Sequence, residues 1–169
     1  MISTMDQPTS GRVHVDGKNI QQIKPLSLFR AKHIGFVFQF HHLLPHLTLQ
    51  ENVEIPMVVI ERSKKTRSSK AEYLLEKVGL YEKRHAFANR ISGGERQRTA
   101  IARSLANNPE LILADEPTGN VDTHTGLEIM TFMIDHCREH ATTLLVATHN
   151  HEIAQLTERI IYLKNGQLE

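Results

Sequence analysis

Two adjacent carboxylates, Asp115 and Glu116, are the first residues whose position in the sequence indicates chemistry. They follow the apolar residues 111–114 and precede Pro117, as expected at the end of a buried strand. Strands of an open parallel sheet end at the crevice where ligands bind. One carboxylate there can hold Mg²⁺, and its neighbour can polarise an attacking water. A surface acidic pair after a core strand has the same local sequence, so this pair alone leaves both interpretations open.

The sequence Ser-Gly-Gly-Glu at residues 92–95 is a second candidate site. It lies at the start of a run of helix-forming residues, 95–107. Ser92 can cap this helix, and the free amides of Gly93 and Gly94 at the positive end of the helix dipole can bind an anion. A flexible turn with a serine cap has the same tripeptide. The carboxylate pair, 23 positions after Ser92, favours phosphate binding.

Strands and helices alternate along the chain, which predicts an α/β fold. Residues 11–17 alternate apolar and polar types between two glycines and predict an antiparallel edge strand. Residues 33–39 predict a buried strand that ends on a polar residue. Buried strands of the same design are predicted at residues 111–115, 143–149 and 159–166. The first two of these have uninterrupted apolar runs, which predicts that both of their faces are covered.

A crossover helix is predicted between the strands at residues 111–115 and 143–149. Residues 126–140 place apolar side chains close to one stripe, and a helix of this kind makes the two strands parallel neighbours. The side chains of the stripe are Leu127, Met130, Ile134 and Cys137.

The middle of the chain has helical periodicity instead. Residues 68–80 place four apolar side chains on one face, with serines to cap the start and Gly79 as a stop signal. Residues 61–70 hold six charged side chains and no large aliphatic one, which predicts a solvated connection. The four apolar residues of the helix are Ala71, Leu74, Leu75 and Val78.

The composition fits one domain in a reducing compartment, with the cytoplasm as the expected location. The chain has 169 residues, 20 Lys and Arg against 19 Asp and Glu, and a single cysteine, Cys137. One cysteine excludes an internal disulfide and a thiolate zinc cluster. The net charge of +1 demands no nucleic-acid partner. No apolar stretch approaches the roughly 20 residues that cross a bilayer, and residues 1–10 lack the pattern of a secretory signal.

Residues 91–122, ISGGERQRTAIARSLANNPELILADEPTGNVD, resemble the signature helix, magnesium strand and following loop of the ABC-type ATPases. Gln39 matches the Q-loop glutamine of that family, residues 119–122 match its D-loop, and His149 matches its switch histidine. The resemblance covers about residues 2–166. The amino-acid sequences of these motifs are most similar to those of the lipoprotein-releasing and macrolide-export branch of the family.

This resemblance implies a fold, two cofactors and several catalytic roles. The fold is a single P-loop NTPase-like α/β domain with a mostly parallel core sheet and a helical subdomain at about residues 45–106. The cofactors are ATP and Mg²⁺. Glu116 would be the general base or the water-positioning residue, and His149 would donate to the γ-phosphate. Asp115 would be the Mg²⁺ ligand, and Gln39 would sense the metal and the water.

The resemblance also implies two partners. In the family, two such domains bind two ATP molecules head to tail, so a second ABC ATPase domain is one partner and a transmembrane permease subunit is the other. Ser92, Gly93 and Gly94 would contact the γ-phosphate held by the second domain. Asp122 would contact the opposite subunit. Glu95, where many relatives have glutamine, belongs to the same nucleotide-binding segment.

The phosphate-binding sequence of the family, G-x-x-x-x-G-K-[ST], does not occur in these 169 residues. Residues 1–11 resemble the end of the helix that follows it. We therefore expect Met1 to be an internal position of a longer protein, with the phosphate-loop strand and most of the first helix lacking here. Charge-assisted hydrogen bonds are worth about 1.5–3 kcal/mol each, so the chain alone is expected to bind ATP weakly. It is also expected to be marginally stable or to aggregate.

Three functions are weighed. The first is the ATP-hydrolysing subunit of an export-type ABC transporter, peripheral on the inner face of the cell membrane, and inactive by itself. The alternative is a non-hydrolytic remnant that acts as a docking or dimerisation module. A relative in DNA repair or translation fits less well, because no coiled-coil insertion follows Gln39 and basic stripes are absent. No nucleic-acid partner is expected.

The segment after Gln39 has two further interpretations. A metal site at His41, His42 and His46 is disfavoured, since adjacent histidines on irregular chain rarely converge on one ion. The apolar residues of the segment would line a groove for a cytoplasmic helix of the permease, or would equally belong to the core. These residues are Leu43, Leu44, Pro45 and Leu47.

Overall fold

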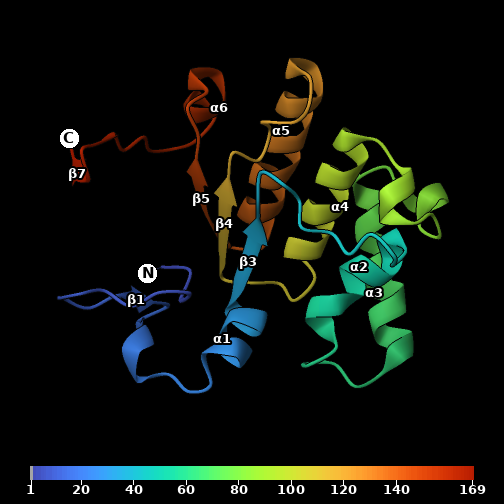
Figure 1. Cartoon of the computed structure of the whole chain (residues 1–169), viewed down its shortest axis with the longest axis horizontal. Coiled ribbons are helices and arrows are strands. Elements are labelled where there is room, and N and C mark those ends of the chain that lie inside the picture. The colour runs from blue at the N-terminus through green and yellow to red at the C-terminus, as the bar shows by residue number, and fades with distance from the viewer. Residues whose placement is uncertain (1) are drawn as a thin grey trace.

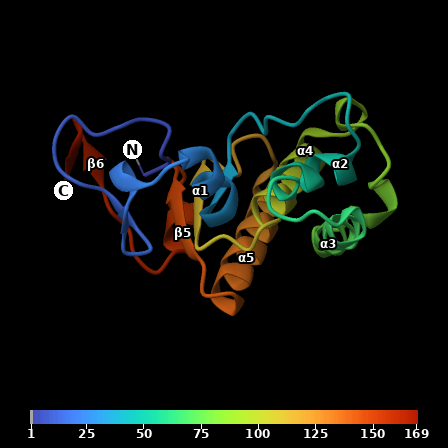
Figure 2. The ribbon, with the colours of Figure 1, turned by 90° about the horizontal axis from the view of Figure 1, so that it is seen from below.

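A three-stranded parallel sheet lies at the centre of the fold. The computed structural model describes residues 2–169 (Figures 1 and 2). The sheet has the order β3 (Ile34–Val37), β4 (Leu111–Asp115) and β5 (Thr143–Ala147), and both pairings are parallel. Because the register aligns the carboxyl ends of all three strands, the segments that follow them meet at one edge of the sheet.

Helices connect these strands as the sequence predicts. α1 (Leu26–His33) leads directly into β3, and α5 (Thr123–Glu139) connects β4 to β5 alongside the sheet (Figure 1). α6 (His151–Gln155) follows β5. The β4–α5–β5 unit is the predicted crossover, and the structure confirms it.

The buried face of α5 is rotated slightly from the predicted stripe. Met130 and Cys137 are buried as predicted, but Ile129 and Met133 complete the core face. Burial raises the pKa of the Cys137 thiol to about 11. The predicted core residues that are only partly buried are Leu127 and Ile134.

Helices make up the middle of the chain, which confirms the predicted periodicity. The α-helices are α2 (Leu49–Glu54), α3 (Lys64–Lys77) and α4 (Gly93–Ser104). Between residues 45 and 106, the described chain forms no strand pairing beyond an isolated bridge of Thr48 with Phe87. That this segment is a separate subdomain stays a prediction. Short 3-10 turns lie at Ile20–Gln22, Ile55–Met57, Tyr81–Lys83 and Ala88–Arg90.

The start of α3 corrects the prediction of a solvated connection at residues 61–70. The helix begins at Lys64, because the Ser63 hydroxyl accepts a hydrogen bond from the backbone N–H of Thr66. Lysine and arginine are good helix formers, so charge alone does not exclude a helix. Gly79, with φ of +70°, follows the helix end as predicted.

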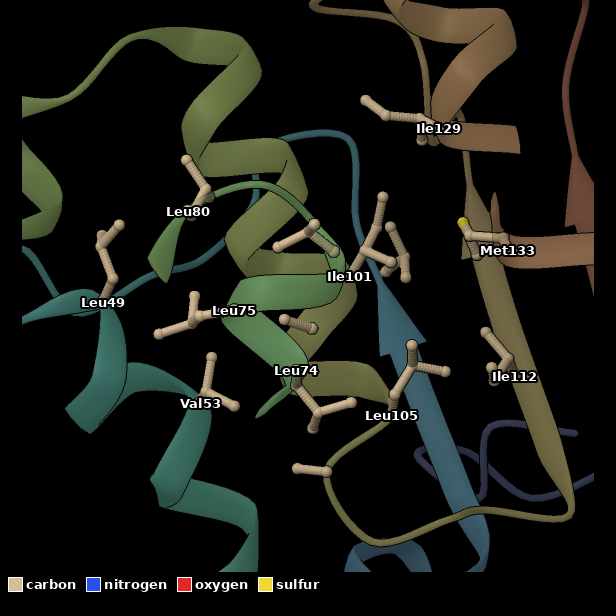
Figure 3. Close-up of a cluster of buried hydrophobic side chains, with 14 of the residues drawn as sticks. Leu49, Val53, Leu74, Leu75, Leu80, Ile101, Leu105, Ile112, Ile129 and Met133 are labelled. Atoms are coloured by element: carbon tan, nitrogen blue, oxygen red, sulfur yellow. The ribbon is translucent and has the colours of Figure 1, made fainter. Parts of the chain in front are cut away.

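One hydrophobic core joins the helical segment to the sheet (Figure 3). It contains side chains from α2, α3, α4, β4 and α5, and the labelled ones are at most 4% exposed. Because the core is continuous, α4 packs against the other helices on one side and the sheet on the other. The labelled residues are Leu49, Val53, Leu74, Leu75, Leu80, Ile101, Leu105, Ile112, Ile129 and Met133.

Two strand predictions need correction. β5 is not covered on both faces, since its residues alternate between exposed and partly buried, and Leu145 is 44% exposed. Residues 159–166 do not form the predicted buried strand. Instead β6 (Leu163–Lys164) pairs antiparallel with β7 (Gln167–Leu168), away from β5 (Figure 1). An apolar run forms a strand only where a neighbouring strand pairs with it.

The first segment of the chain forms a hairpin. β1 (His14–Val15) pairs antiparallel with β2 (Lys18–Asn19), which confirms the antiparallel strand predicted at residues 11–17. Residues 2–11 form turns and bends, whereas the sequence predicted the end of a helix. Pro8 and the serines and threonines of this stretch are poor helix formers, which accounts for the difference. Met1 lies outside the described residues.

Candidate functional site

Glu116 continues from β4 at the carboxyl edge of the sheet. Its backbone N–H donates to the Ala147 carbonyl at 2.9 Å, so pairing with β5 extends to this residue. Its φ of +45° lies in the left-handed region, which is uncommon for residues other than glycine. Pro117 follows and ends the strand. The chain therefore turns sharply at the predicted catalytic carboxylate, a feature frequent at functional sites.

The structure brings Glu116 and His149 together, although 33 positions separate them. Glu116 Oε1 accepts from the backbone N–H of His149 at 2.8 Å and lies 2.6 Å from its Nδ1. The Thr148 hydroxyl donates to the other oxygen, Oε2, at 3.0 Å. Burial raises the pKa of the Glu116 carboxyl, but these hydrogen bonds outweigh burial and hold the pKa below its usual value. Glu116 is thus an oriented carboxylate in its ionised form.

Gln39 lies beside the loop that matches the D-loop. Its carbonyl accepts a hydrogen bond from the Asn120 side-chain amide at 2.5 Å. A Cβ placed on Gly119 would lie 3.4 Å from Gln39 Nε2, so the glutamine side chain packs closely over this glycine. Asp115 is exposed at the end of β4, the strand next to the one that precedes Gln39. These residues share the carboxyl edge of the sheet.

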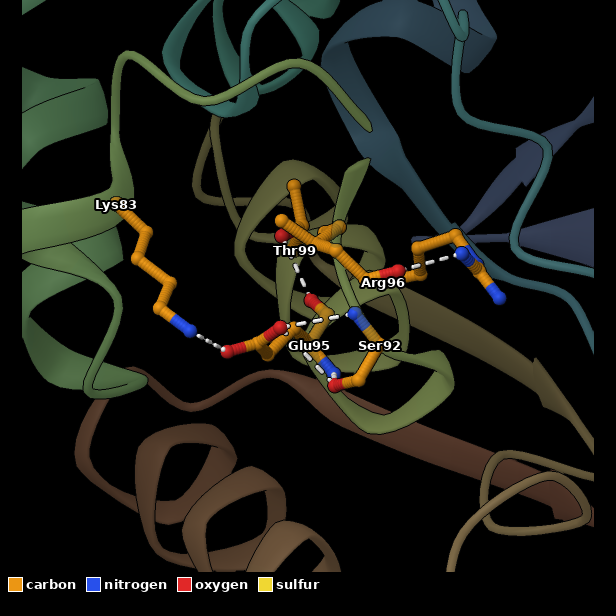
Figure 4. A network of polar contacts seen from close by, with 6 residues as sticks. Lys83, Ser92, Glu95, Arg96 and Thr99 are labelled. Carbon is orange, nitrogen blue, oxygen red and sulfur yellow. Dashed lines mark hydrogen bonds and ion pairs between the residues drawn. The ribbon is translucent and has the colours of Figure 1, made fainter. Parts of the chain in front are cut away.

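The Ser-Gly-Gly-Glu segment forms the start of α4, as predicted (Figure 4). The Ser92 hydroxyl accepts from the backbone N–H of Glu95, and the Glu95 carboxylate accepts from the backbone N–H of Ser92 at 2.9 Å. Lys83 Nζ is 2.5 Å from the same carboxylate. The Lys83 bond and the Ser92 bonds lower the pKa of Glu95 to about 2. The contact of Glu95 with nucleotide stays a prediction, because its oxygens are engaged within the chain here.

The start of α4 packs against the loop that follows β4. A Cβ on Gly93 would lie 3.4 Å from the Asn120 carbonyl, and one on Gly94 would lie 3.5 Å from Val121. Gln97, which is 2% exposed, donates from Nε2 to the Pro117 carbonyl at 2.5 Å. The glycine turn and the carboxylate loop are therefore one packed unit. The role of Gln97 was not predicted, although a polar side chain on the buried face of a helix is a signal for it.

Asp122 has a structural role in this chain. It is the N-cap of α5, and its carboxylate accepts from the backbone N–H of Thr125 at 3.0 Å. The hydrogen bonds from Thr125 lower the pKa of this carboxyl. Its predicted contact with an opposite subunit stays a prediction.

Arg103, in the last turn of α4, holds the segment after Gln39. Its guanidinium donates to the carbonyls of His41 and His42 at 2.6 and 2.7 Å. Both histidines have positive φ values, +61° and +48°, so the arginine stabilises an uncommon backbone conformation. This contact was not predicted, because it joins positions about 60 apart and has no local signal in the sequence.

The histidines and leucines of this segment point to no single role. Within residues 2–169, no group of three or more His, Cys, Asp or Glu side chains could hold a metal ion. His41 is buried, Leu43 is partly buried against the core, and Leu44 is 50% exposed. Neither a purely core role nor a purely exposed groove describes the predicted docking residues.

Known proteins share this combination of fold and motifs. The sequence model of the family described as "ABC transporter" matches residues 1–119. The chain is 42% identical over 170 aligned positions to the lipoprotein-releasing system ATP-binding protein LolD of Aquifex aeolicus, which covers 99% of the chain and 75% of LolD. The chain belongs to the ABC transporter ATP-binding family.

Two further relatives support this family and its fold. The macrolide export ATP-binding/permease protein MacB of Rhodopirellula baltica is 44% identical over 98% of the chain and 25% of MacB. The ATP-binding cassette MJ0796, solved as a dimer in a post-hydrolysis state bound to ADP and Pi, superposes with a TM-score of 0.91. That match has 41% identity and covers 99% of the chain and 75% of MJ0796.

Family membership confirms three predictions. The fold is that of an α/β ABC ATPase, the protein class is an ATPase, and ATP is the nucleotide that this class of domain binds. No helix of residues 2–169 has the length and apolar character that crossing a bilayer requires.

Proposed function

We propose that this chain is the ATP-hydrolysing subunit of an export-type ABC transporter. The main support is the single packed unit that joins the glycine turn of α4 to the loop carrying Glu116, with Gln97 bonded to the Pro117 carbonyl. This packing fixes the position of the N-terminus of α4, which can bind an anion, relative to the oriented carboxylate of Glu116. Relatives in lipoprotein release and macrolide export support the export type.

The residues have distinct roles in this proposal. Glu116 accepts or orients the proton of the attacking water, and its lowered pKa keeps it ionised at neutral pH. His149, whose side chain is 86% exposed, reaches from Glu116 toward the γ-phosphate. The amides of Gly93 and Gly94 at the positive end of α4, with the Ser92 side chain beside them, bind the phosphate of a nucleotide held by a second domain.

Asp115 and Gln39 fit a Mg²⁺ site by their chemistry. A carboxylate and an amide oxygen are hard oxygen ligands, which Mg²⁺ prefers. Asp115 is the last residue of β4, and Gln39 follows the neighbouring strand β3. When bound, the ion supplies positive charge to the phosphate oxygens. Asp115 is exposed, so it can reach such an ion without a change of the backbone.

The partners in this proposal are a second ABC ATPase domain and a transmembrane permease subunit. The dimeric state of MJ0796 supports the first, and the fused permease named in MacB supports the second. We place the chain in the cytoplasm, peripheral on the inner face of the cell membrane. Asp122 follows Val121, the residue that packs against Gly94, and is the proposed contact with the second domain.

The proposal is tested by ATP hydrolysis with and without a glycine-rich loop. No G-x-x-x-x-G-K-[ST] sequence occurs in the 169 residues, so we expect background turnover from this chain. A version with such a segment fused before residue 1 should hydrolyse ATP. Glu116→Gln in the fused protein should lower kcat by about 10² to 10⁴, whereas Asp135→Asn, a matched change at an exposed position of α5, should not.

An opposite outcome selects the alternative function. A fused protein that binds ATP with ordinary affinity and still shows no turnover would favour a non-hydrolytic docking or dimerisation module. Turnover that persists unchanged in Glu116→Gln would remove the role proposed for this carboxylate.

A further inference from the structure

Three consecutive aliphatic side chains are exposed at the turn between α2 and α3. Val58 is 57% exposed, Val59 is 64% exposed and Ile60 is 39% exposed. Figure 1 shows this connection at the end of the molecule opposite to the carboxyl ends of the strands. Single exposed apolar residues are ordinary, but a contiguous exposed cluster marks a contact surface.

The turn is held in a defined shape that presents these side chains outward. The backbone N–H of Val58 donates to Ile55, and those of Ile60 and Glu61 both donate to the Met57 carbonyl, at 3.0 and 2.8 Å. Met57 is 2% exposed and anchors the turn in the core. The aliphatic cluster therefore projects from a fixed base and needs little ordering when it binds.

Three cationic side chains follow directly. Arg62, Lys64 and Lys65 are exposed, and none of them takes part in an ion pair within the described part of the chain. The nearby Glu61 carboxylate accepts a hydrogen bond from the backbone N–H of Ser63. The Arg67 guanidinium is likewise engaged, with the carbonyls of Glu61 and Arg62.

Two of these cations, Lys64 and Lys65, lie at a position that is unfavourable for the stability of α3. Lys64 and Lys65 are the first two residues of α3, whose first turn contains no acidic residue. The dipole gives this helix end a partial positive charge, so lysines here repel it. Hydrogen bonds with Thr48, and to a smaller extent the charge of Lys64, lower the pKa of Glu51, whose carboxylate already caps α2. Helix end and side chains together make one positive surface beside the aliphatic turn.

We propose that residues 58–65 form a contact with an anionic lipid surface. The aliphatic side chains enter the boundary between headgroups and acyl chains, while the three cations bind the acidic headgroups. Stable membrane association requires two signals of this kind, since one myristoyl chain alone gives only marginal, reversible binding, with an association constant of about 10⁴ M⁻¹. Exposed aliphatic side chains beside three exposed cations match the apolar and anionic layers of such a surface.

This proposal does not rest on the ATPase assignment, because no nucleotide contact enters it. The test is co-sedimentation of the 169-residue chain with phosphatidylglycerol vesicles and with phosphatidylcholine vesicles. We expect binding to the first and little to the second. Binding should fall between 0.1 and 1 M salt, as the screening length shortens from about 10 to 3 Å.

Two variants separate the two parts of the surface. The triple change Arg62→Gln, Lys64→Gln and Lys65→Gln should lower binding about 100-fold, since each cation near the surface contributes about fivefold. It should leave thermal stability unchanged or slightly higher, because it removes the repulsion at the start of α3. Val58→Ser with Val59→Ser should lower binding to the vesicles but leave the salt dependence of that binding unchanged.

Matched variants elsewhere serve as controls. Arg12→Gln, Lys24→Gln and Lys32→Gln remove the same charge from exposed positions, and Leu163→Ser with Leu168→Ser removes aliphatics that are each 72% exposed. Equal losses in these controls would overturn the proposal in favour of overall charge or general stickiness. Absence of binding to every pure lipid vesicle, with binding only to vesicles that contain a permease, would overturn it in favour of a protein partner.

Discussion

The Glu116 carboxylate and the His149 imidazole lie 2.6 Å apart between Oε1 and Nδ1, and the backbone N–H of His149 donates to the same oxygen. The carboxylate is thus fixed by a residue that follows the neighbouring strand. Because the parallel register of β4 and β5 sets this distance, the pair depends on the sheet and not on the flexibility of either loop.

Replacing His149 should change the titration of Glu116. In His149→Ala the burial of Glu116 remains while the side-chain hydrogen bond is lost, so the pKa of Glu116 should rise. A group with a depressed pKa stabilises the fold above its unfolded pKa, and this stabilisation is lost as pH falls through the folded pKa. The variant should therefore lose less stability on acidification. Carboxyl NMR titration measures the shift, with His151→Ala as the control, and an unchanged Glu116 pKa would contradict this account.

The Glu95 capping interaction predicts a pH-dependent stability. Its pKa of about 2, against an ordinary 4.5, means that its contribution is complete above about pH 4.5 and lost as pH falls toward 2. Glu95→Gln should lower the free energy of unfolding by about 1 kcal/mol at pH 7, since Lys83 is a partly exposed partner. Urea unfolding should show this difference shrinking between pH 4.5 and 2. Glu82→Gln, an exposed change in the same region, should show no such trend.

Arg103 is expected to be important for the segment after Gln39. Arg103→Met leaves two carbonyls without their charged donor and should cost about 2 to 4 kcal/mol in unfolding free energy. Arg103→Lys should be intermediate, because a lysine lacks the fork that reaches both carbonyls. Hydrogen exchange at residues 40–44 should accelerate in Arg103→Met more than exchange in α5. Uniform acceleration across the chain would indicate general destabilisation instead.

Gly35 in β3 should tolerate no side chain. A Cβ there would lie 2.4 Å from the backbone carbonyl of Ser104, so strand and helix α4 would have to separate. Gly35→Ala should therefore cost about 1–3 kcal/mol, measured by thermal or urea unfolding. Gly93→Ala, whose Cβ would meet its nearest neighbour at 3.4 Å, is the matched control and should change stability much less. Equal stability of both variants would show that β3 and α4 can move apart easily.

The sequence predicted those features of the fold that depend on residues within one short segment. The carboxylates after β4, the Ser92 cap of α4 and the crossover helix α5 all follow from apolar runs and capping residues within one segment. Patterns could not predict Arg103 or Gln97, because each bonds to a backbone carbonyl far away in the sequence. The carbonyl has no sequence signature, so only the folded chain shows it.

The prediction of a buried strand at residues 159–166 was wrong for a related reason. Its apolar content is real, and Ile161 and Tyr162 are 49% and 55% exposed because no strand lies beside them in the described chain. Conversely, residues 64–70 form a helix despite their charge, since Ser63 supplies the cap and the following apolar face supplies the packing. Whether a segment becomes a strand depends on a neighbouring strand that pairs with it, and whether it becomes a helix depends on a capping residue. Apolar content alone predicts neither.

Cys137 gives the chain a practical advantage for spectroscopy. Its thiol is 4% exposed and its pKa is about 11, so very little of the reactive thiolate exists at neutral pH. Maleimide or nitroxide reagents should therefore leave it unmodified under native conditions. New cysteines on the surface can carry paired labels without replacing the native one, and distances between them would report how the start of α4 moves relative to the turn before α3.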